Sequence, residues 1–267
     1  MRAFLASPLG FLIGMSLGAL GGGGSILAVP ALVYGAGQTP KHATTTSLIL
    51  VAVTAVIGII PHWRAGRVRF GAGTIFGVAG IGGSLVGSHA NKAADPDVLL
   101  LAFSGLMLIA AYGMFRRVGV SSTLVDAPVP SRTISVRTAT PIETGTVAKV
   151  VIAGTVVGLL TGFFGVGGGF VIVPALVLAM GFTMPEAVGT SLLVITINSL
   201  VALTSRLQSG AVEWRTVVLF TIASLLGVIV GSRLASSRDS SSLQRWFVAL
   251  LVVVAVYTAT RSVVALR

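Results

Sequence analysis

Charged residues are few along the chain and separate long uncharged windows. In the first half the windows run between Arg2 and Lys41, Lys41 and Arg64, Arg69 and Lys92, and Asp97 and Arg116. In the second half they run between Lys149 and Glu186, Glu186 and Arg206, Arg215 and Arg233, and Arg245 and Arg261. A helix needs about 20 apolar residues to cross the ~30 Å hydrocarbon layer, and helices satisfy their own backbone groups in lipid. The pattern therefore predicts an all-α fold, a polytopic transmembrane helical bundle.

The order of one long and three shorter windows occurs twice, which indicates two homologous repeats. An offset of 144 positions aligns residues 14–88 with 158–232 without a gap, and the identities fall on glycine, proline and a Thr-Ser pair. We predict a first transmembrane repeat at 1–117, a polar linker loop at 118–146 and a second transmembrane repeat at 147–267. Each repeat is expected to have a Gly-broken first helix followed by three further transmembrane helices.

The first window of each repeat is interrupted by glycine, at Gly21–Gly24 and at Gly165–Gly169. Glycine costs about 1 kcal/mol relative to alanine in a helix interior, so consecutive glycines predict a helix break. The piece after the first break, residues 26–37, would reach only about 18 Å at 1.5 Å per residue. It is too short to cross, so we expect it to begin near the middle of the membrane. Its N-terminal amides and dipole would then form an anion site.

Glycine also permits close helix packing in membranes. We interpret Gly14-x-x-x-Gly18 and Gly83-x-x-x-Gly87 in that way. For the two clusters we favour a break, because packing alone does not require consecutive glycines.

Polar residues in the spans complete the predicted substrate site. Hydroxyl pairs near the starts of two helices either cap the helix or donate to an anion, and an amide in mid-helix either joins helices or contacts the ligand. The predicted substrate-binding residues are Gly22, Gly23, Gly24, Ser25, Thr46, Ser47, Gly167, Gly168, Gly169, Thr190, Ser191 and Asn198. At helix ends, His62, Arg206 and Gln208 are possible anion-attracting groups, although snorkelling towards the interface is the more ordinary role for such residues.

Composition supports the membrane assignment and narrows the chemistry. Hydrophobic residues make up 54% of the chain, charged residues make up 9%, and the formal net charge is +11. The basic residues lie at segment ends, as positive-inside topology requires, rather than in a nucleic-acid-binding patch. The seven carboxylates fall at window edges or in loops, so a cation pathway lacks its usual ligand.

Other chemistries find little support in the sequence. The chain has no cysteine, which excludes a disulfide framework and thiol chemistry. The first glycine cluster lacks the lysine of a phosphate-binding loop. A serine hydrolase built from Ser25 with His42 or His62 is disfavoured, because the second repeat has Gly169 at the serine position. We therefore expect no enzyme activity, no metal and no cofactor.

The doubled glycine-proline motif resembles that of the TauE/SafE sulfite exporter family. It runs from Gly18 to Leu32 and again from Gly162 to Leu176, and the blocks at 43–47, 66–68 and 80–87 also fit. The resemblance covers nearly the whole chain apart from the linker. It implies a permease of the inner (cytoplasmic) membrane for small anions, chiefly sulfite, sulfonates such as sulfoacetate, and related sulfur or organic anions. Its expected partners are the small anionic substrate, the lipid bilayer and further copies of the chain in a homo-oligomer, with no nucleic acid.

Two questions of mechanism stay open at this point. We expect alternating access between two repeats around a central site, with an anion channel as the alternative. If the broken first element crosses the membrane, each repeat has four spans and the copies are parallel. If it returns to its starting side, three spans remain and the copies are inverted, which the loop charges favour.

Overall fold

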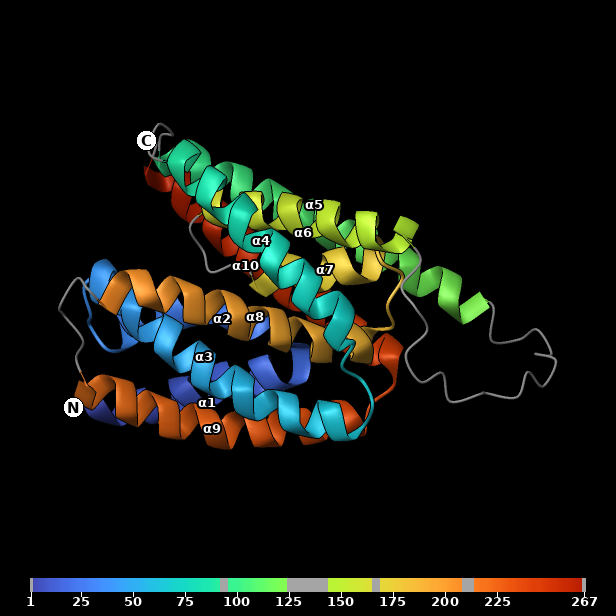
Figure 1. The fold of residues 1–267 in the computed structure, drawn as a ribbon. Coiled ribbons are helices and arrows are strands. Elements are labelled where there is room, and N and C mark those ends of the chain that lie inside the picture. Colours follow the sequence, from blue (N-terminus) through green and yellow to red (C-terminus); the bar gives the residue numbers. More distant parts are fainter. Residues whose placement is uncertain (1, 92–95, 124–143, 165–168, 208–213, 266–267) are drawn as a thin grey trace.

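The computed structural model describes residues 2–91, 96–123, 144–164, 169–207 and 214–265, and this part of the chain is almost entirely helical (Figure 1). The first half forms α1 (Arg2–Leu20), α2 (Gly23–Pro30), the π-helical turn η1 (Ala31–Gly35), α3 (Pro40–Arg64), α4 (Phe70–Asn91) and α5 (Pro96–Thr123). The second half forms α6 (Thr144–Phe164), α7 (Gly169–Leu178), α8 (Met184–Leu207), α9 (Trp214–Ser236) and α10 (Ser240–Ala265). The predicted all-α fold is confirmed.

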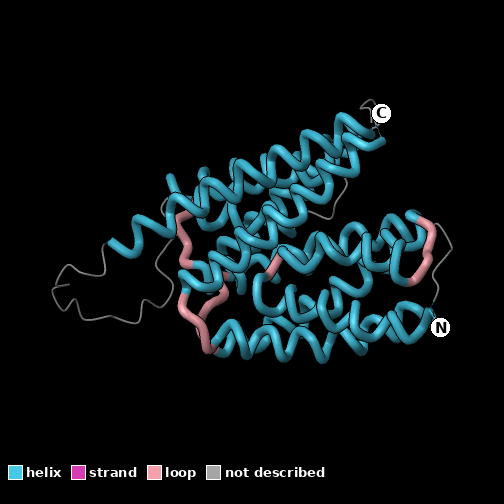
Figure 2. The backbone as a smooth tube through the Cα atoms, turned by 180° about the vertical axis from the view of Figure 1, so that it is seen from behind, coloured by secondary structure: helices cyan, strands magenta, loops and turns pink. Residues whose placement is uncertain are grey.

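Six of the described helices are long and apolar enough to cross a membrane, namely α3, α4, α6, α8, α9 and α10. The spans of α3 and α8 are each 56% buried, against 28–44% for the other four, so these two helices form the centre of the bundle. Described loops gather at its two ends, apart from a short non-helical piece inside (Figure 2). The predicted multi-pass membrane bundle is thus confirmed.

Exposed aromatic residues mark the two ends of the bundle. Trp63 lies at the end of α3 and Trp246 near the start of α10, whereas Trp214 begins α9 and Tyr257 lies late in α10. Tryptophan and tyrosine favour the interfaces between hydrocarbon and water, because their rings are apolar with one polar tip. These residues therefore fit two aromatic belts with the apolar helix surfaces between them.

The broken first element is a hairpin whose second arm returns along the first. Gly24 packs against Leu17 and the carbonyl of Ile13, and further along the second arm Gly35 packs against Leu9. Residue numbers thus rise on one arm as they fall on the other, which makes α2 and η1 antiparallel to α1. The element therefore returns to its starting side, and α3, α4 and α5 follow it as the remaining long helices of the first half.

Close glycine contacts join α1 to α9. A methyl group at Gly14 would overlap the carbonyl oxygen of Ser224, and one at Gly18 would overlap that of Val228. Because both numbers rise together, α1 and α9 run parallel. The backbones touch along this line, so Gly14 and Gly18 are packing residues, as the sequence indicated.

The same contacts recur between α6 and α4. Gly158 lies against Gly80, and Gly162 lies against Ser84. Each of these four residues is 144 positions from its counterpart in the α1–α9 contact. On the α4 side of the same contact, Gly83 and Gly87 pack against the carbonyls of Thr155 and Leu159 of α6. The packing interpretation of that motif is therefore confirmed as well.

Helices at corresponding places in the two halves run in opposite directions. Gly58 of α3 packs against Leu192 of α8, and nearer the end of α3 His62 packs against Gly189, so these helices are antiparallel. In α5 and α10, the hydroxyls of Ser104 and Thr258 lie 2.8 Å apart, and Gln244 Nε2 donates to the carbonyl of Met114 at 2.8 Å, which is again antiparallel.

Only the two edges of the predicted linker loop are described in the structure. Helix α5 continues to Thr123 and α6 begins at Thr144, so both helices extend into the range 118–146. Residues 124–143 lie outside the described part of the chain. The second glycine cluster falls largely between α6 and α7, at 165–168, which is also outside that part.

Candidate functional site

The first glycine cluster breaks the helix where the sequence predicted. Helix α1 ends at Leu20, and Gly21 adopts a φ of +65°, a backbone conformation that favours glycine. Helix α2 then begins at Gly23, and Ser25 Oγ donates to the carbonyl of Gly22 at 2.7 Å. The hairpin tip is therefore set by one positive-φ glycine and one local serine bond.

This tip lies against the beginning of α7. A methyl group at Gly22 would overlap the carbonyl oxygen of Gly169, and one at Gly169 would overlap Ser25 Oγ. Helices α2 and α7 are in contact at this point, so two helix N-termini lie together in the protein interior. The first N–H groups of a helix lack intrahelical acceptors, and the helix dipole places partial positive charge there. The predicted residues Gly167 and Gly168 lie outside the described part of the chain.

Hydroxyls from α8 border the same tip. A side chain at Gly21 would meet Ser191 Oγ and the backbone of Val188. Ser191 Oγ donates to the Val188 carbonyl at 2.8 Å, and Thr190 Oγ1 accepts the backbone N–H of Arg69 at 3.1 Å. Both side chains are fully buried. The structure thus brings Ser191 to the first break, and it places Thr190 where α8 meets the start of α4.

The matching hydroxyls of α3 lie elsewhere. Thr46 is about 24 Å from His62 along α3, at 1.5 Å per residue, and His62 is near the hairpin tip. Ser47 Oγ donates to the Thr44 carbonyl at 2.8 Å. Thr46 Oγ1 is fully buried and has no hydrogen-bond partner among the described residues. Thr46 and Ser47 therefore do not join Ser191 around one point.

Helix capping is not the role of these hydroxyls, so that alternative is wrong. The cap of α3 is Thr39, whose Oγ1 accepts the backbone N–H of His42 at 3.5 Å. At the start of α8, Glu186 Oε2 accepts from the backbone N–H of Thr183 at 3.1 Å and from the Thr183 hydroxyl at 3.0 Å. Thr183-x-x-Glu186 is the spacing of a capping box, and this signal was available in the sequence.

His62 does not snorkel, which corrects the more ordinary interpretation of this residue. It is only 2% exposed, and its Nε2 lies 3.3 Å from the carbonyl oxygen of Gly18 at the end of α1. Arg64 is exposed, consistent with snorkelling. Arg206 belongs to the last turn of α8, and Gln208 lies outside the described residues. Attraction of anions by these groups stays a prediction.

Asn198 stands apart from the break. It lies seven residues beyond Ser191, about 10 Å along α8, and its amide nitrogen is near Gly80 of α4. Its Oδ1 is buried with no partner among the described residues. Thr54, at the matching place in α3, donates to the Leu50 carbonyl of its own helix at 2.6 Å. The Oδ1 atom of Asn198 is thus available as an acceptor, for example to a water molecule, whereas the Thr54 hydroxyl already donates within its helix.

The buried polar side chains of the described residues are hydroxyls and glutamine amides, together with His62. Glu186 lies in the first turn of α8, where it pairs with Arg69, and no cluster of three metal-ligating residues occurs in the described part of the chain. Ser25 is bonded to the backbone and His62 lies at the Gly18 carbonyl, so neither is arranged with the other as a nucleophile and base. Helix N-termini, hydroxyls and amides can bind an anion by hydrogen bonds.

The family model for the sulfite exporter TauE/SafE matches residues 6–258. The chain belongs to the TauE/SafE family. A "Probable membrane transporter protein" of Xylella fastidiosa (strain Temecula1) is 33% identical over 262 residues, covering 95% of this chain and 93% of that protein. The "Probable membrane transporter protein YunE" of Bacillus subtilis (strain 168) is 26% identical over 258 residues, covering 94% of this chain and 90% of that protein. No solved structure gives a significant match.

TauE/SafE membership establishes the protein as a multi-pass membrane transporter. The family match includes both glycine clusters, and the matches with the two relatives named above span nearly the whole length of each protein. Within this TauE/SafE chain, sequence reasoning missed the Arg69–Glu186 pair and the contact of His62 with Gly18. Both join residues that are distant in sequence, so no local pattern indicated them.

Proposed function

We propose that this TauE/SafE transporter carries small anions, chiefly sulfite, sulfonates of the sulfoacetate type, and related sulfur or organic anions. The observation that carries the proposal is the contact of Gly22 with Gly169, where α2 and α7 begin. Two positive dipole ends in a low-dielectric interior repel each other. A bound anion would remove this repulsion and accept hydrogen bonds from the first amides of both helices.

The proposed site includes helix N-terminal amides and no carboxylate, and the hydroxyls of Ser25 and Ser191 would turn from their backbone carbonyls to donate to the anion. Gly22–Ser25, Gly169 and Ser191 are adjacent in the structure. We place Gly167 and Gly168 with them because of their position in the sequence. We place Thr46, Ser47, Thr190 and Asn198 farther from the helix break, along the path that the anion would take through the bundle. Hydrogen bonds to a charged ligand contribute about 1.5–3 kcal/mol each, so a few amides would suffice for binding.

We infer further that the two halves are inverted repeats. The support is twofold: the glycine contacts of α1 with α9 recur between α6 and α4 at an offset of 144 positions, and the corresponding helices run in opposite directions. Inverted repeats provide two conformations of similar energy, related by exchange of the roles of the halves. This arrangement favours alternating access over an open channel.

Loop charge gives the orientation of the proposed transporter. One end of the bundle carries the α3–α4 turn, the end of α5, the start of α6 and the α9–α10 turn. Its basic residues are Arg64, Arg67, Arg69, Arg116, Arg117, Lys149, Arg233, Arg238 and Arg245. The opposite end carries seven, namely Arg2, Lys41, Lys92, Arg206, Arg215, Arg261 and Arg267. Because cytoplasmic loops carry the larger number of basic residues, we assign the end with nine to the cytoplasmic side of an inner membrane protein. Helix α1 would then begin, and α10 would end, on the opposite side.

Transport of labelled anions into liposomes tests the proposal. Purified protein is reconstituted, and uptake of radiolabelled sulfite, sulfoacetate and sulfate is measured against protein-free liposomes. We expect saturable uptake of at least one of these anions, at the modest rates of a carrier. Uptake of none of them would contradict the proposed substrate class, and flux that never saturates would favour a channel.

A further inference from the structure

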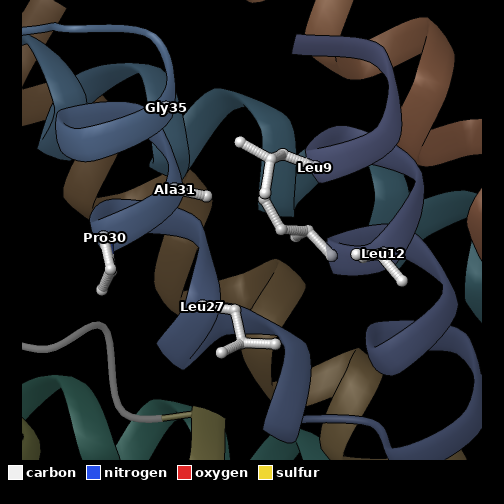
Figure 3. Close-up of a pocket in the computed structure, with 7 residues that line it drawn as sticks. Leu9, Leu12, Leu27, Pro30, Ala31 and Gly35 are labelled. Carbon is white, nitrogen blue, oxygen red and sulfur yellow. The ribbon is translucent and has the colours of Figure 1, made fainter. Parts of the chain in front are cut away.

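The two arms of the first hairpin enclose an apolar groove. Its walls are Leu9, Leu12 and Ile13 on α1, and Leu27, Pro30 and Ala31 on the returning arm, with Gly35 at its outer end (Figure 3). The volume of the groove is about 480 Å³. We call it the hairpin groove.

Contacts at its two ends explain why the groove is open between them. At the tip, Gly24 lies against Leu17 and Ile13, and at the outer end Gly35 lies against Leu9. Between these points the returning arm changes from α-helix to π-helix after Pro30, and the N–H of Ala36 bonds the carbonyl of Ala31 at 3.3 Å. A π-turn displaces a helix from its ideal path, so the arms separate in the middle.

The groove opens onto the apolar surface of the bundle. Leu12, on its wall, is 48% exposed, and it belongs to the apolar part of α1. Exposed leucine and valine side chains cover the other spans in the same way, including Val253 of α10 at 66%. In a multi-pass membrane protein such a surface faces lipid tails, so the groove continues the lipid interface inwards.

Chemistry limits what can fill the hairpin groove. Its seven lining residues are apolar, so a water molecule would lack the two to four polar partners that it needs. The anion of the proposed function is excluded for the same reason, because a charge without hydrogen bonds is strongly disfavoured there. A hydrocarbon chain needs no hydrogen bonds, and its dispersion contacts with the apolar walls fill space that would otherwise stay empty.

We propose that the hairpin groove binds one acyl chain of a membrane lipid. The lipid contacts both arms of the hairpin that carries the Gly21–Gly24 break, and it holds them apart at Ala31. This binding site is distinct from the anion site at the tip, and it does not depend on the identity of the transported solute.

Photocrosslinking tests the proposal on a nearly unaltered chain. A benzophenone amino acid is incorporated at Leu12, or at Val253 as a control on the lipid-facing surface. Each protein is irradiated before and after extensive detergent washing, and adducts are identified by mass spectrometry. We expect lipid adducts at both positions before washing, and after washing about tenfold more at Leu12 than at Val253.

Two results of the crosslinking would overturn the proposal. Lipid adducts at Leu12 that disappear in parallel with those at Val253 would show that the groove exchanges like ordinary surface lipid. Adducts to the protein chain itself would show that a protein segment fills the groove. In a second measurement, native mass spectrometry of washed Ala31→Phe should find one bound lipid fewer per chain than in the wild type, and an equal number would contradict the proposal.

Discussion

Arg69 and Glu186, which are 117 residues apart in sequence, join the start of α4 to the start of α8. Arg69 Nη2 lies 2.6 Å and Nε 3.1 Å from Glu186 Oε1, while Oε2 of the same carboxylate accepts from Thr183. One carboxylate therefore holds a tertiary contact and caps a helix. Because Arg69 is 56% exposed, the ion pair alone contributes little.

We predict that Glu186→Ala destabilises the protein more than Arg69→Ala. The glutamate variant loses the cap, typically about 1 kcal/mol, together with the pair, whereas the arginine variant loses only a half-exposed pair of about 0–1 kcal/mol. Thermal unfolding in detergent of both variants and of the double variant measures the difference. Equal losses in the two single variants would show that the cap contributes nothing.

Glycine substitutions should separate packing from helix propensity. Gly82 has open space around it, so Gly82→Ala should raise the free energy of unfolding by up to about 1 kcal/mol, because alanine has the higher helix propensity. Gly14→Ala and Gly158→Ala place a methyl group on a neighbouring backbone carbonyl, and overpacking of this kind costs about 1–3 kcal/mol. We expect lower melting temperatures for both variants than for Gly82→Ala. If Gly14→Ala matched Gly82→Ala, the close contact of α1 with α9 would be refuted.

The unpaired hydroxyl of Thr46 gives a test of ligand contact. Thr46→Val removes a buried hydroxyl that has no described partner, so stability should stay equal or rise by about 1 kcal/mol. If the hydroxyl donates to the anion, KM for uptake should rise about tenfold.

Thr54→Val is the matched control, because Thr54 Oγ1 bonds the Leu50 carbonyl of its own helix. It should leave the KM for uptake unchanged. An unchanged KM in Thr46→Val as well would remove Thr46 from the proposed path.

His62 is expected to support the hairpin tip through Gly18. His62→Ala leaves the Gly18 carbonyl without its side-chain contact and opens space, at a cost of about 1–3 kcal/mol for the unpaired group. His62→Gln retains a donor of similar reach and should keep more stability and more uptake than His62→Ala. Thermal unfolding and uptake are measured for both variants, and equal behaviour would show that the contact with Gly18 is unimportant.

The sequence predicted those features that depend on local pattern. Uncharged windows gave the long helices, and consecutive glycines gave the break at Gly21 and Gly22, because both effects act within a few residues. The contact partners of Gly14 and Gly83 were not predictable, since a motif for close packing does not specify the neighbouring helix.

The site was predicted only in part for the same reason. Ser191 lies at the first break, but Thr46 lies at the other end of the central helices, because α3 and α8 are antiparallel. His62 was expected to snorkel from its place near a helix end, whereas the tip of α1 covers it. Burial of that kind is decided by tertiary packing, which the sequence of α3 does not contain.

Anion uptake by two glycine variants tests the central claim most directly. Gly22→Ala places a methyl group where the two short helices meet, and Gly82→Ala places one in open space. With both variants eluting as the wild type does on size exclusion, we predict saturable uptake by the wild type and Gly82→Ala and its loss in Gly22→Ala. Wild-type uptake by Gly22→Ala would contradict an anion site at the helix break.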